Sequence, residues 1–359
     1  MTSDSHLHTL RVPRSITTLE GLLNGFRAYQ VLKAALDLGL FELLAREGGL
    51  GREDIASRLG VNGMFIRSFL LSLVDIGLVA EQGGKYRNTE TADCFLVKNR
   101  PLYQGDWIEE DTGKASRWGD LAAQLQKMTP DAYAFDLAPR TSFIRALGQR
   151  SLRGELQGVT REIASWDGFP TARTVLDLGG GHGLYAIALC QINPDLHGVV
   201  FDKPHIIPET QRFLDAYNMS DRLCATGGDI DADAIEGEYD IVVASHILYK
   251  FRKNMPGFFQ KVWETLKPGG LLVLNHWFCA PGCLPRGGLV EMDKAFLSFG
   301  HPLCHIETFN GLLADCGFDV VSSKEISSTY GTSNLHIAMK APAIRQSPQC
   351  RASSCCSPR

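Results

Sequence analysis

The segment Val175–Cys190, VLDLGGGHGLYAIALC, constrains the fold of this chain more than any other. It predicts a short apolar strand, a glycine-rich turn and an apolar helix, the arrangement that opens a doubly wound nucleotide-binding sheet. Glycines let the backbone approach a ligand, and the free N–H groups at the helix start can bind a carboxylate. A dinucleotide fingerprint would need glycine at position 184, which is leucine, so the spacing D-x-G-x-G-x-G disfavours NAD.

The chain after this turn continues the same pattern. Short apolar runs such as HGVVFD and YDIVVAS alternate with helical segments, which is typical of βαβ units and a mostly parallel sheet. Asp202 ends the next strand, where a carboxylate can accept both hydroxyls of a ribose. Asp229 and Ile230 follow in GGDID, where they could hold the edge and the face of an adenine.

The first hundred residues have a helical pattern instead. Three helical segments precede two short strands around Gly83–Gly84, which is a winged-helix order. The helix that would read DNA, residues 62–76, carries only Arg67 and Asp75 as charges, and residues 1–100 hold 12 basic and 11 acidic side chains. Groove reading needs clustered positive charge, so this region predicts a dimerisation domain and no nucleic-acid partner.

Composition excludes several other classes. The net charge of −4 gives no polyanion site, and no apolar run is long enough to predict a signal peptide or a membrane span. Ten scattered cysteines predict a reduced, cytoplasmic protein, and the spacing of CAPGC predicts no metal site. Three cysteines, Cys350, Cys355 and Cys356, lie in a tail predicted to be disordered, whose thiols could gather a thiophilic metal.

In this order, DLGGGHG, FDKP, GGDI, LKPGG and F-x-x-L-L-x-x-C-G-F at residues 309–318 resemble the S-adenosylmethionine site of a class I methyltransferase. More narrowly, residues 20–341 resemble the plant caffeate and acetylserotonin type of O-methyltransferase, whose bacterial relatives modify polyketides, carotenoids and bacteriochlorophyll. The resemblance implies a Rossmann-like domain, S-adenosylmethionine as cofactor, and a homodimer formed through the winged-helix domain. The predicted cofactor-binding residues are Asp177, Gly179, Gly181, Asp202, Asp229, Ile230 and Ser245.

The resemblance also implies a division of the chain into four parts. Residues 1–110 form the winged-helix-like dimerisation domain, and residues 111–168 form a helical connector that lines the acceptor cavity. Residues 169–341 form the methyltransferase domain, and residues 342–359 are the cysteine-containing tail.

The catalytic residues of this family do not carry over directly. The resemblance implies a catalytic His after the strand YDIVVAS, but Tyr249 occupies that place and His246 lies three residues earlier. The acidic partner of the family, in an E-R-T run, is also missing. The region that should supply it offers other polar residues, namely Glu291, Asp293, Lys294, His301, His305 and Glu307.

Three interpretations of this departure remain open. Tyr249 could hydrogen-bond the acceptor while another group acts as base, because a neutral Tyr is a donor at pH 7. His246 could be the base, since its ordinary pKa suits proton transfer at neutral pH. His301 or His305 could instead reach the cavity from the later loop.

The predicted function is methyl transfer from S-adenosylmethionine to a small, apolar, aromatic acceptor, with oxygen as the favoured atom. Carbon methylation of a tetrapyrrole or similar conjugated ring is the alternative, because Tyr249 resembles the residue of bacteriochlorophyllide methyltransferases. A non-catalytic, cofactor-binding regulatory dimer is a second alternative, and a thiol or metalloid acceptor, suggested by the cysteine-rich tail, is a third.

Overall fold

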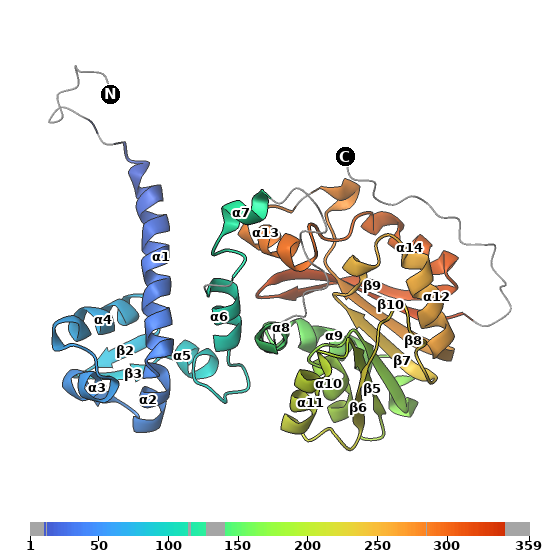
Figure 1. Ribbon diagram of the computed structural model, residues 1–359, viewed down its shortest axis with the longest axis horizontal. Helices are drawn as coiled ribbons and strands as arrows, with labels where there is room; N and C mark the ends of the chain where they lie inside the picture. Colours follow the sequence, from blue (N-terminus) through green and yellow to red (C-terminus); the bar gives the residue numbers. More distant parts are fainter. Residues whose placement is uncertain (1–10, 12, 114–115, 127–140, 285, 342–359) are drawn as a thin grey trace. The chain divides into compact units, whose positions relative to one another are not determined.

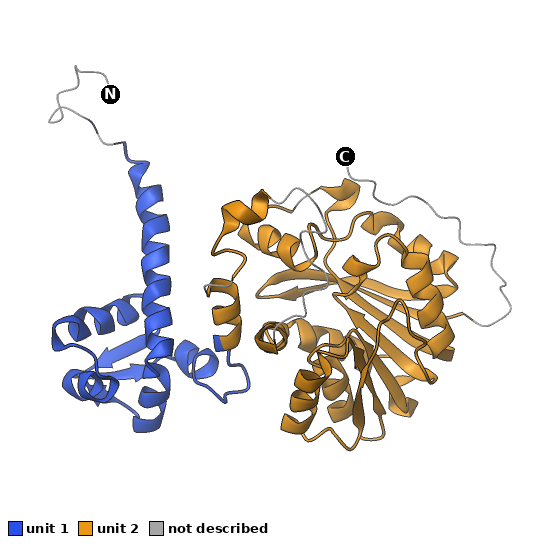
Figure 2. Ribbon diagram, viewed as in Figure 1, with its two compact units in different colours: residues 1–105 blue, residues 106–359 orange. Residues whose placement is uncertain are grey.

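A computed structural model describes residues 11, 13–113, 116–126, 141–284 and 286–341 (Figure 1). The chain forms two compact units, residues 1–105 and 106–359 (Figure 2). Residues 111–168, predicted as a connector, thus belong to the same unit as the large sheet. The predicted tail, residues 342–359, lies outside the described residues.

The first unit is helical with a small antiparallel sheet in the order β1-β3-β2. The hairpin follows the helices as predicted, but four helices precede it where the sequence predicted three, because the first predicted segment is divided into α1 and α2. Gly83 and Gly84 form the hairpin turn with φ of 60° and 75°, values that favour glycine. The elements are α1 (Ile16–Asp37), α2 (Leu40–Glu47), β1 (Leu50–Gly51), α3 (Arg52–Leu59), α4 (Gly63–Asp75), β2 (Val79–Gln82), β3 (Lys85–Asn88) and α5 (Glu90–Phe95).

Two helices of this unit expose large apolar side chains. On α1, Leu22 is 71% exposed and Phe26 is 63% exposed, and Ala35 is the one residue of the helix that is buried. On α4, Met64 and Phe65 are exposed while the opposite face is buried in the unit. An amphipathic helix usually turns its apolar face inward, so these side chains indicate a surface that a partner covers.

The second unit contains a seven-stranded sheet in the order β6-β5-β4-β7-β8-β10-β9. Neighbouring strands are parallel from β6 to β8, whereas β10 and β9 pair antiparallel at one edge. The predicted mostly parallel sheet is therefore confirmed. The strands are β4 (Thr174–Leu178), β5 (His197–Asp202), β6 (Leu223–Gly227), β7 (Tyr239–Ser245), β8 (Leu266–His276), β9 (Phe318–Ser328) and β10 (Gly331–Lys340).

Helices cover both faces of this sheet (Figure 1). On one face, α9 (Glu155–Ala164), α10 (Leu184–Ile192) and α11 (Ile207–Ala216) share an apolar core with alternate strand residues such as Val175 and Val243. On the other face, α12 (Met255–Thr265) and α14 (Ile306–Asp315) pack with the intervening residues, such as Leu176 and Val242. The alternation follows from the two-residue period of a strand. The other helices are α6 (Gly105–Thr112), α7 (Leu121–Leu125), α8 (Thr141–Ser151) and α13 (Gly288–Leu297).

The strand order reverses beside β4, which pairs with β5 on one side and with β7 on the other. In doubly wound sheets, ligands bind at such a reversal, beyond the carboxyl ends of the strands. The glycine turn, Asp202 and Ser245 all lie at these ends. The fold therefore places the predicted site residues at one edge of the sheet.

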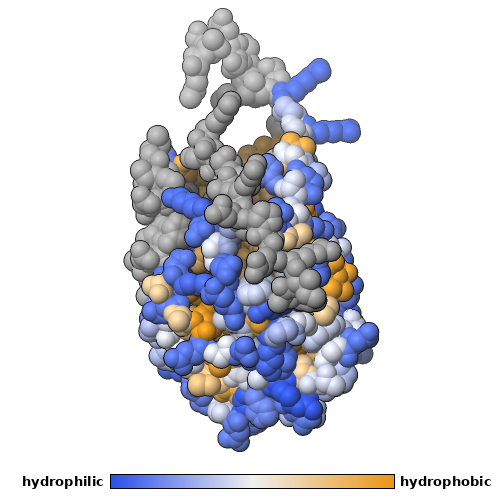
Figure 3. Space-filling model, turned by 90° about the vertical axis from the view of Figure 1, so that its right-hand side faces the viewer, coloured by the Kyte–Doolittle hydropathy of each residue, from blue (hydrophilic) through white to orange (hydrophobic). Residues whose placement is uncertain are grey.

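The outer surface gives few further indications. No helix within the described ranges has both the length and the apolarity that a membrane crossing requires. The face shown in Figure 3 is mostly hydrophilic, and among the residues coloured there the apolar side chains form small, separate patches.

Candidate active site

The glycine turn between β4 and α10 has a backbone that only glycine adopts easily. Gly179, Gly181 and Gly183 have φ of 66°, 52° and 68°. A Cβ atom on Gly179 would lie 1.9 Å from the side chain of Ile247, so the turn packs closely against the segment after β7. The N–H of Gly181 donates to a carboxylate oxygen of Asp202 at 2.8 Å. The first two predicted cofactor motifs are thus in direct contact.

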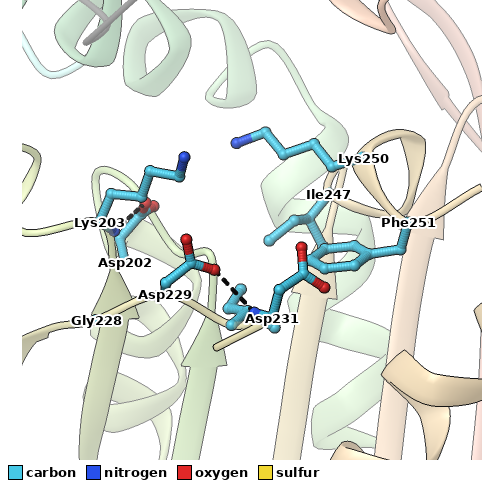
Figure 4. Close-up of a pocket in the computed structure, with 9 residues that line it drawn as sticks. Asp202, Lys203, Gly228, Asp229, Asp231, Ile247, Lys250 and Phe251 are labelled. Carbon is cyan, nitrogen blue, oxygen red and sulfur yellow. Dashed lines mark hydrogen bonds between the residues drawn. The ribbon is translucent and has the colours of Figure 1, made fainter. Parts of the chain in front are cut away.

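A cavity of about 230 Å³ lies beyond the ends of β5 and β6 (Figure 4). Asp202 and Asp229 point toward it, and the amines of Lys203 and Lys250 approach one another above it. Ile230 gives an apolar wall and is itself 8% exposed. Carboxylates beside an apolar wall could hold the ribose hydroxyls and the base of a nucleoside. The described lining is Asp202, Lys203, Gly228, Asp229, Ile230, Asp231, Ile247, Lys250 and Phe251.

A second cavity, of about 610 Å³, continues from the first. The two share four lining residues: Asp202, Lys203, Ile247 and Lys250. The larger cavity passes Asp177, Gly179, Gly181 and Ser245 and ends among aromatic side chains, which include Trp107, Trp118, Phe143, Trp277, Phe296 and Phe299. One nucleoside-like ligand could therefore occupy the shared region and leave the aromatic end for a second molecule.

Asp177 is the most deeply buried of the predicted cofactor residues, with 1% of its surface exposed. Burial raises the pKa of its carboxyl to about 7, and the charge of Asp202 adds to this while the N–H of Ala186 opposes it. A carboxyl with a pKa of about 7 gains or loses its charge near neutral pH. It could therefore become ionised when a cationic group of a ligand binds beside it.

His246 and Glu155 form a close pair in the wall of the larger cavity. His246 Nε2 lies 2.8 Å from Glu155 Oε1, although 91 residues separate them in the chain. Its Nδ1 lies 3.0 Å from the Tyr249 hydroxyl. The backbone of His246 has φ of 54°, a left-handed conformation that is strained for a side chain of this size.

The charges of this pair follow from their surroundings. Burial alone would raise the pKa of Glu155, but His246 and Arg150 together hold it at about 2, so Glu155 is ionised. Burial lowers the pKa of His246, and Glu155 only partly opposes this. A neutral imidazole beside a carboxylate donates from Nε2, so its Nδ1 lone pair accepts from the Tyr249 hydroxyl. His246 is thus held in the protonation state of a base.

Tyr249 contacts His246 at the Nδ1 atom of the imidazole. It is 2% exposed and is not among the described residues that line either cavity. Its hydroxyl accepts the backbone N–H of Trp277 at 2.7 Å, which leaves its own proton for His246. Burial raises the pKa of Tyr249 well above its usual value, so the hydroxyl remains a donor. A direct contact between Tyr249 and an acceptor stays a prediction from the sequence.

Glu155 is a candidate site residue that the sequence did not reveal. It begins α9, where an acidic residue is ordinary, and its partners come from distant segments. Its Oε1 also accepts from Tyr185 at 3.2 Å and from Asn275 at 3.1 Å. The segment after β7 is fixed in a similar way, because His276 Nε2 accepts the N–H groups of Ile247 and Leu248.

The remaining sequence candidates have other surroundings. Asp293 lines the larger cavity, where it accepts from Trp118 at 3.1 Å and from Tyr330. His301 contacts the carbonyl of Pro302, and His305 lies beside Cys283. Neither His is among the described lining residues of the two cavities. Within the described part of the chain, no group of three His, Cys, Asp or Glu side chains could hold a metal ion.

Comparison with known proteins identifies the family to which this chain belongs. Residues 20–98 match the O-methyltransferase dimerisation domain, and residues 118–282 match the O-methyltransferase domain. The chain is 30% identical over 271 residues to 3-hydroxy-5-methyl-1-naphthoate 3-O-methyltransferase of Streptomyces sahachiroi. The matched region covers 72% of this chain and 76% of that protein. The chain is 25% identical over 293 residues to L-tyrosine C(3)-methyltransferase of Streptomyces lavendulae, covering 74% and 76%.

A solved structure supports the same fold. Human N-acetylserotonin methyltransferase, in complex with S-adenosylmethionine, superposes with a TM-score of 0.72 over 95% of this chain and 100% of that one, at 22% identity. The chain therefore belongs to the O-methyltransferase family and is an S-adenosylmethionine-dependent methyltransferase that carries the family's dimerisation domain.

Proposed function

We propose that this enzyme methylates a hydroxyl oxygen of a small, flat, largely apolar aromatic acceptor, with His246 as the base. The observation that carries the proposal is the ionised Glu155 hydrogen-bonded to a neutral His246 in the wall of the larger cavity. This cavity also contains the glycine turn, so a base and a cofactor site face the same space.

The cofactor would lie across both cavities, with its adenosine in the smaller cavity and its methionine in the larger one. The adenosine occupies the smaller cavity, with its ribose hydroxyls on Asp202 and its base between Asp229 and Ile230. The methionine part follows the turn at Gly179 and Gly181, with Asp177 and Ser245 beside it. A side chain on Gly179 would clash with Ile247, which lines the same cavity. When bound, S-adenosylmethionine supplies a sulfonium-activated methyl group, and the protein must align the acceptor with it and exclude water.

The acceptor oxygen loses its proton as it takes the methyl group. The new bond is O–CH₃ and the S–CH₃ bond breaks. The proton of the acceptor passes to Nδ1 of His246, which first exchanges its hydrogen bond from the Tyr249 hydroxyl for one from the acceptor hydroxyl, while Tyr249 keeps its own proton. Glu155 stabilises the imidazolium that forms, because it remains a carboxylate at 2.8 Å from Nε2. Tyr249 is then a positioning residue that acts through His246.

The aromatic end of the larger cavity supports a flat acceptor. Trp118 and Phe296 meet edge to face with centroids 5.6 Å apart, and Phe143 and Phe299 line the same space. Rigid aromatic walls favour a planar apolar molecule. The two relatives, whose names give a naphthoate and a tyrosine as acceptors, support an aromatic acceptor and a role in natural-product metabolism.

Carbon methylation is the second candidate. The relative from Streptomyces lavendulae is named for methylation at C3 of tyrosine, a ring carbon. Deprotonation of a phenol by His246 would also activate the neighbouring ring carbons. Which atom reacts then depends on which one the walls of the cavity align with the methyl group.

The test is an assay with S-adenosylmethionine and a panel of phenols and naphthols, followed by NMR of each methylated product. We expect an aryl methyl ether and one equivalent of S-adenosylhomocysteine, and loss of turnover in His246→Ala. A methyl group on a ring carbon would favour the second candidate. Full turnover in His246→Ala would refute the role of the base.

The first unit supports a homodimer as the assembled form. Its most exposed large apolar side chains lie on α1 and α4, within residues 20–98 of the dimerisation domain or just before them. Replacing Leu22 and Phe26 together by Asp should convert a dimer into monomers in analytical ultracentrifugation, and a dimer that persists would assign pairing to another surface.

The seven described cysteines are free thiols, which supports a reducing, cytoplasmic location.

A further inference from the structure

Arg150, near the end of α8, is a buried cation in the wall of the larger cavity. It is 8% exposed and lines the cavity near its aromatic end. Its guanidinium carbon lies 4.7 Å from the ring centre of Trp277, 4.8 Å from that of Tyr330 and 5.4 Å from that of Trp107. Three aromatic rings therefore form a cage that fixes the position of this charge.

The cage satisfies only part of the guanidinium. Its Nη1 atom has no hydrogen-bond partner in the part of the chain that the structure describes. The Tyr330 hydroxyl makes a hydrogen bond with Arg150, whereas the faces of the rings attract the cation but offer no lone pairs to its other N–H groups. A buried cation with an unsatisfied N–H group is costly unless a ligand supplies an acceptor for that group.

The nearby carboxylates are engaged elsewhere. Glu155 directs Oε1 to His246, Tyr185 and Asn275. Asp293 accepts from Trp118 and Tyr330. Burial raises the pKa of Asp111 to about 6, and the charge of Asp293 adds to this, although Arg153 and Arg150 oppose it. The Asp111 carboxyl therefore holds its proton more strongly than an ordinary aspartate.

Arg150 and His246 share one indole. The His246 ring centre lies 4.2 Å from that of Trp277, and the guanidinium lies over the same ring. Lys294 adds a second positive charge there, with Nζ 5.5 Å from Trp277, while it donates to the Thr332 carbonyl at 3.0 Å. An anion on Arg150 and a hydroxyl near His246 could thus belong to one aromatic molecule.

We propose that Arg150 binds a carboxylate of the acceptor, so that the substrates of this enzyme are aromatic hydroxy acids. This inference rests on the proposed function, whose reaction it narrows to one substrate class. The planar fork of a guanidinium pairs with both oxygens of a carboxylate and so fixes the orientation of the ring that carries it. The acceptor hydroxyl is then directed toward His246 by the same contact that binds the molecule.

Binding can be measured without turnover. Calorimetry of 1-naphthoate and of the neutral 1-naphthamide into the S-adenosylhomocysteine complex compares the two charges on one ring system. We expect 1-naphthoate to bind more tightly than the amide. Arg150→Gln should weaken the naphthoate by about 10- to 100-fold, the range of a charged hydrogen bond, and should remove its advantage over the amide. Arg150→Lys should keep part of that advantage.

Arg153→Gln is the matched control. Arg153 lies in the same neighbourhood, 5.5 Å from the ring of Trp107, but is not among the described lining residues of the cavity. Removal of its charge should leave naphthoate binding within about threefold of the wild type, as expected for a charge that makes no direct contact. Thermal unfolding of each variant shows whether the fold is kept.

Each outcome decides the proposal. Equal binding of acid and amide, or equal loss in Arg150→Gln and Arg153→Gln, would overturn it. Loss of S-adenosylhomocysteine binding in Arg150→Gln would assign this arginine to the cofactor carboxylate and would also overturn it. Selective naphthoate binding that depends on Arg150 supports the subsite even if no acceptor is methylated, in which case only the proposed reaction fails.

Discussion

The two ends of the large cavity are built in different ways. The cofactor end comes from the ends of three strands, at Gly179, Asp202 and Ser245, which are neighbours in the parallel part of the sheet. The acceptor end is made by side chains from segments far apart in the chain, such as Trp107, Arg150 and Trp277. Topology alone assembles the first end, whereas the second depends on how individual side chains pack.

The largest expected effect tests the acceptor end. Glu155→Gln should lower kcat by about 10³, within the usual range for general base catalysis, because an amide cannot stabilise the imidazolium of His246. Cofactor affinity, measured by calorimetry, should change little. Glu162→Gln on the same helix is the control, because its partner is Lys324 at the surface. A kcat for Glu155→Gln close to that of the wild type would separate Glu155 from catalysis.

The same residue should link stability to pH. The pKa of Glu155 is about 2 in the folded protein and 4.5 by its ordinary value. A depressed pKa contributes stability above pH 4.5 that is lost as pH falls toward 2, here about 3 kcal/mol. Chemical denaturation of the wild type and Glu155→Gln at several pH values measures this contribution. Curves that keep a constant separation from pH 6 to pH 3 would contradict the assigned pKa.

The third prediction tests the cofactor end. Asp202→Ala should raise the Kd of S-adenosylmethionine by about 10- to 100-fold, the usual range for lost hydrogen bonds to a charged group. The same substitution also releases the N–H of Gly181. Asp195→Ala, at an exposed carboxylate of the same unit, is the control. Unchanged binding in Asp202→Ala would move the ribose to another part of the cavity.

The smallest expected effect concerns Tyr249. Tyr249→Phe should lower kcat by about tenfold, because His246 loses the group that orients it. The Tyr hydroxyl donates to Nδ1 and so favours the neutral imidazole. Its removal should raise the pKa of His246, and the acid limb of the pH–rate profile should move to higher pH. A slower enzyme with an unmoved acid limb would show that Tyr249 only supports packing.

The sequence predicted the cofactor end of the cavity better than the acceptor end, because strand topology assembles the first and side-chain packing the second. Strand periodicity and the glycine turn predicted the parallel sheet, and the residues at its strand ends all line a cavity in the structure. His246 and Tyr249 were predicted as competing alternatives, but the structure joins them by a hydrogen bond. Glu155 and Arg150 gave no signal, because single charges on amphipathic helices are ordinary and their partners depend on the tertiary fold.

The left-handed backbone of His246 has a consequence for the stability of this protein. A φ of 54° suits Gly or Asn better than His. The conformation of His246 therefore lowers the free energy of unfolding by about 1 kcal/mol or more. The hydrogen bond from its N–H to the Asn275 carbonyl at 2.8 Å keeps it there. Replacing His246 by Gly or Asn should therefore relieve backbone strain while it removes the proposed base, so stability and activity would change in opposite directions.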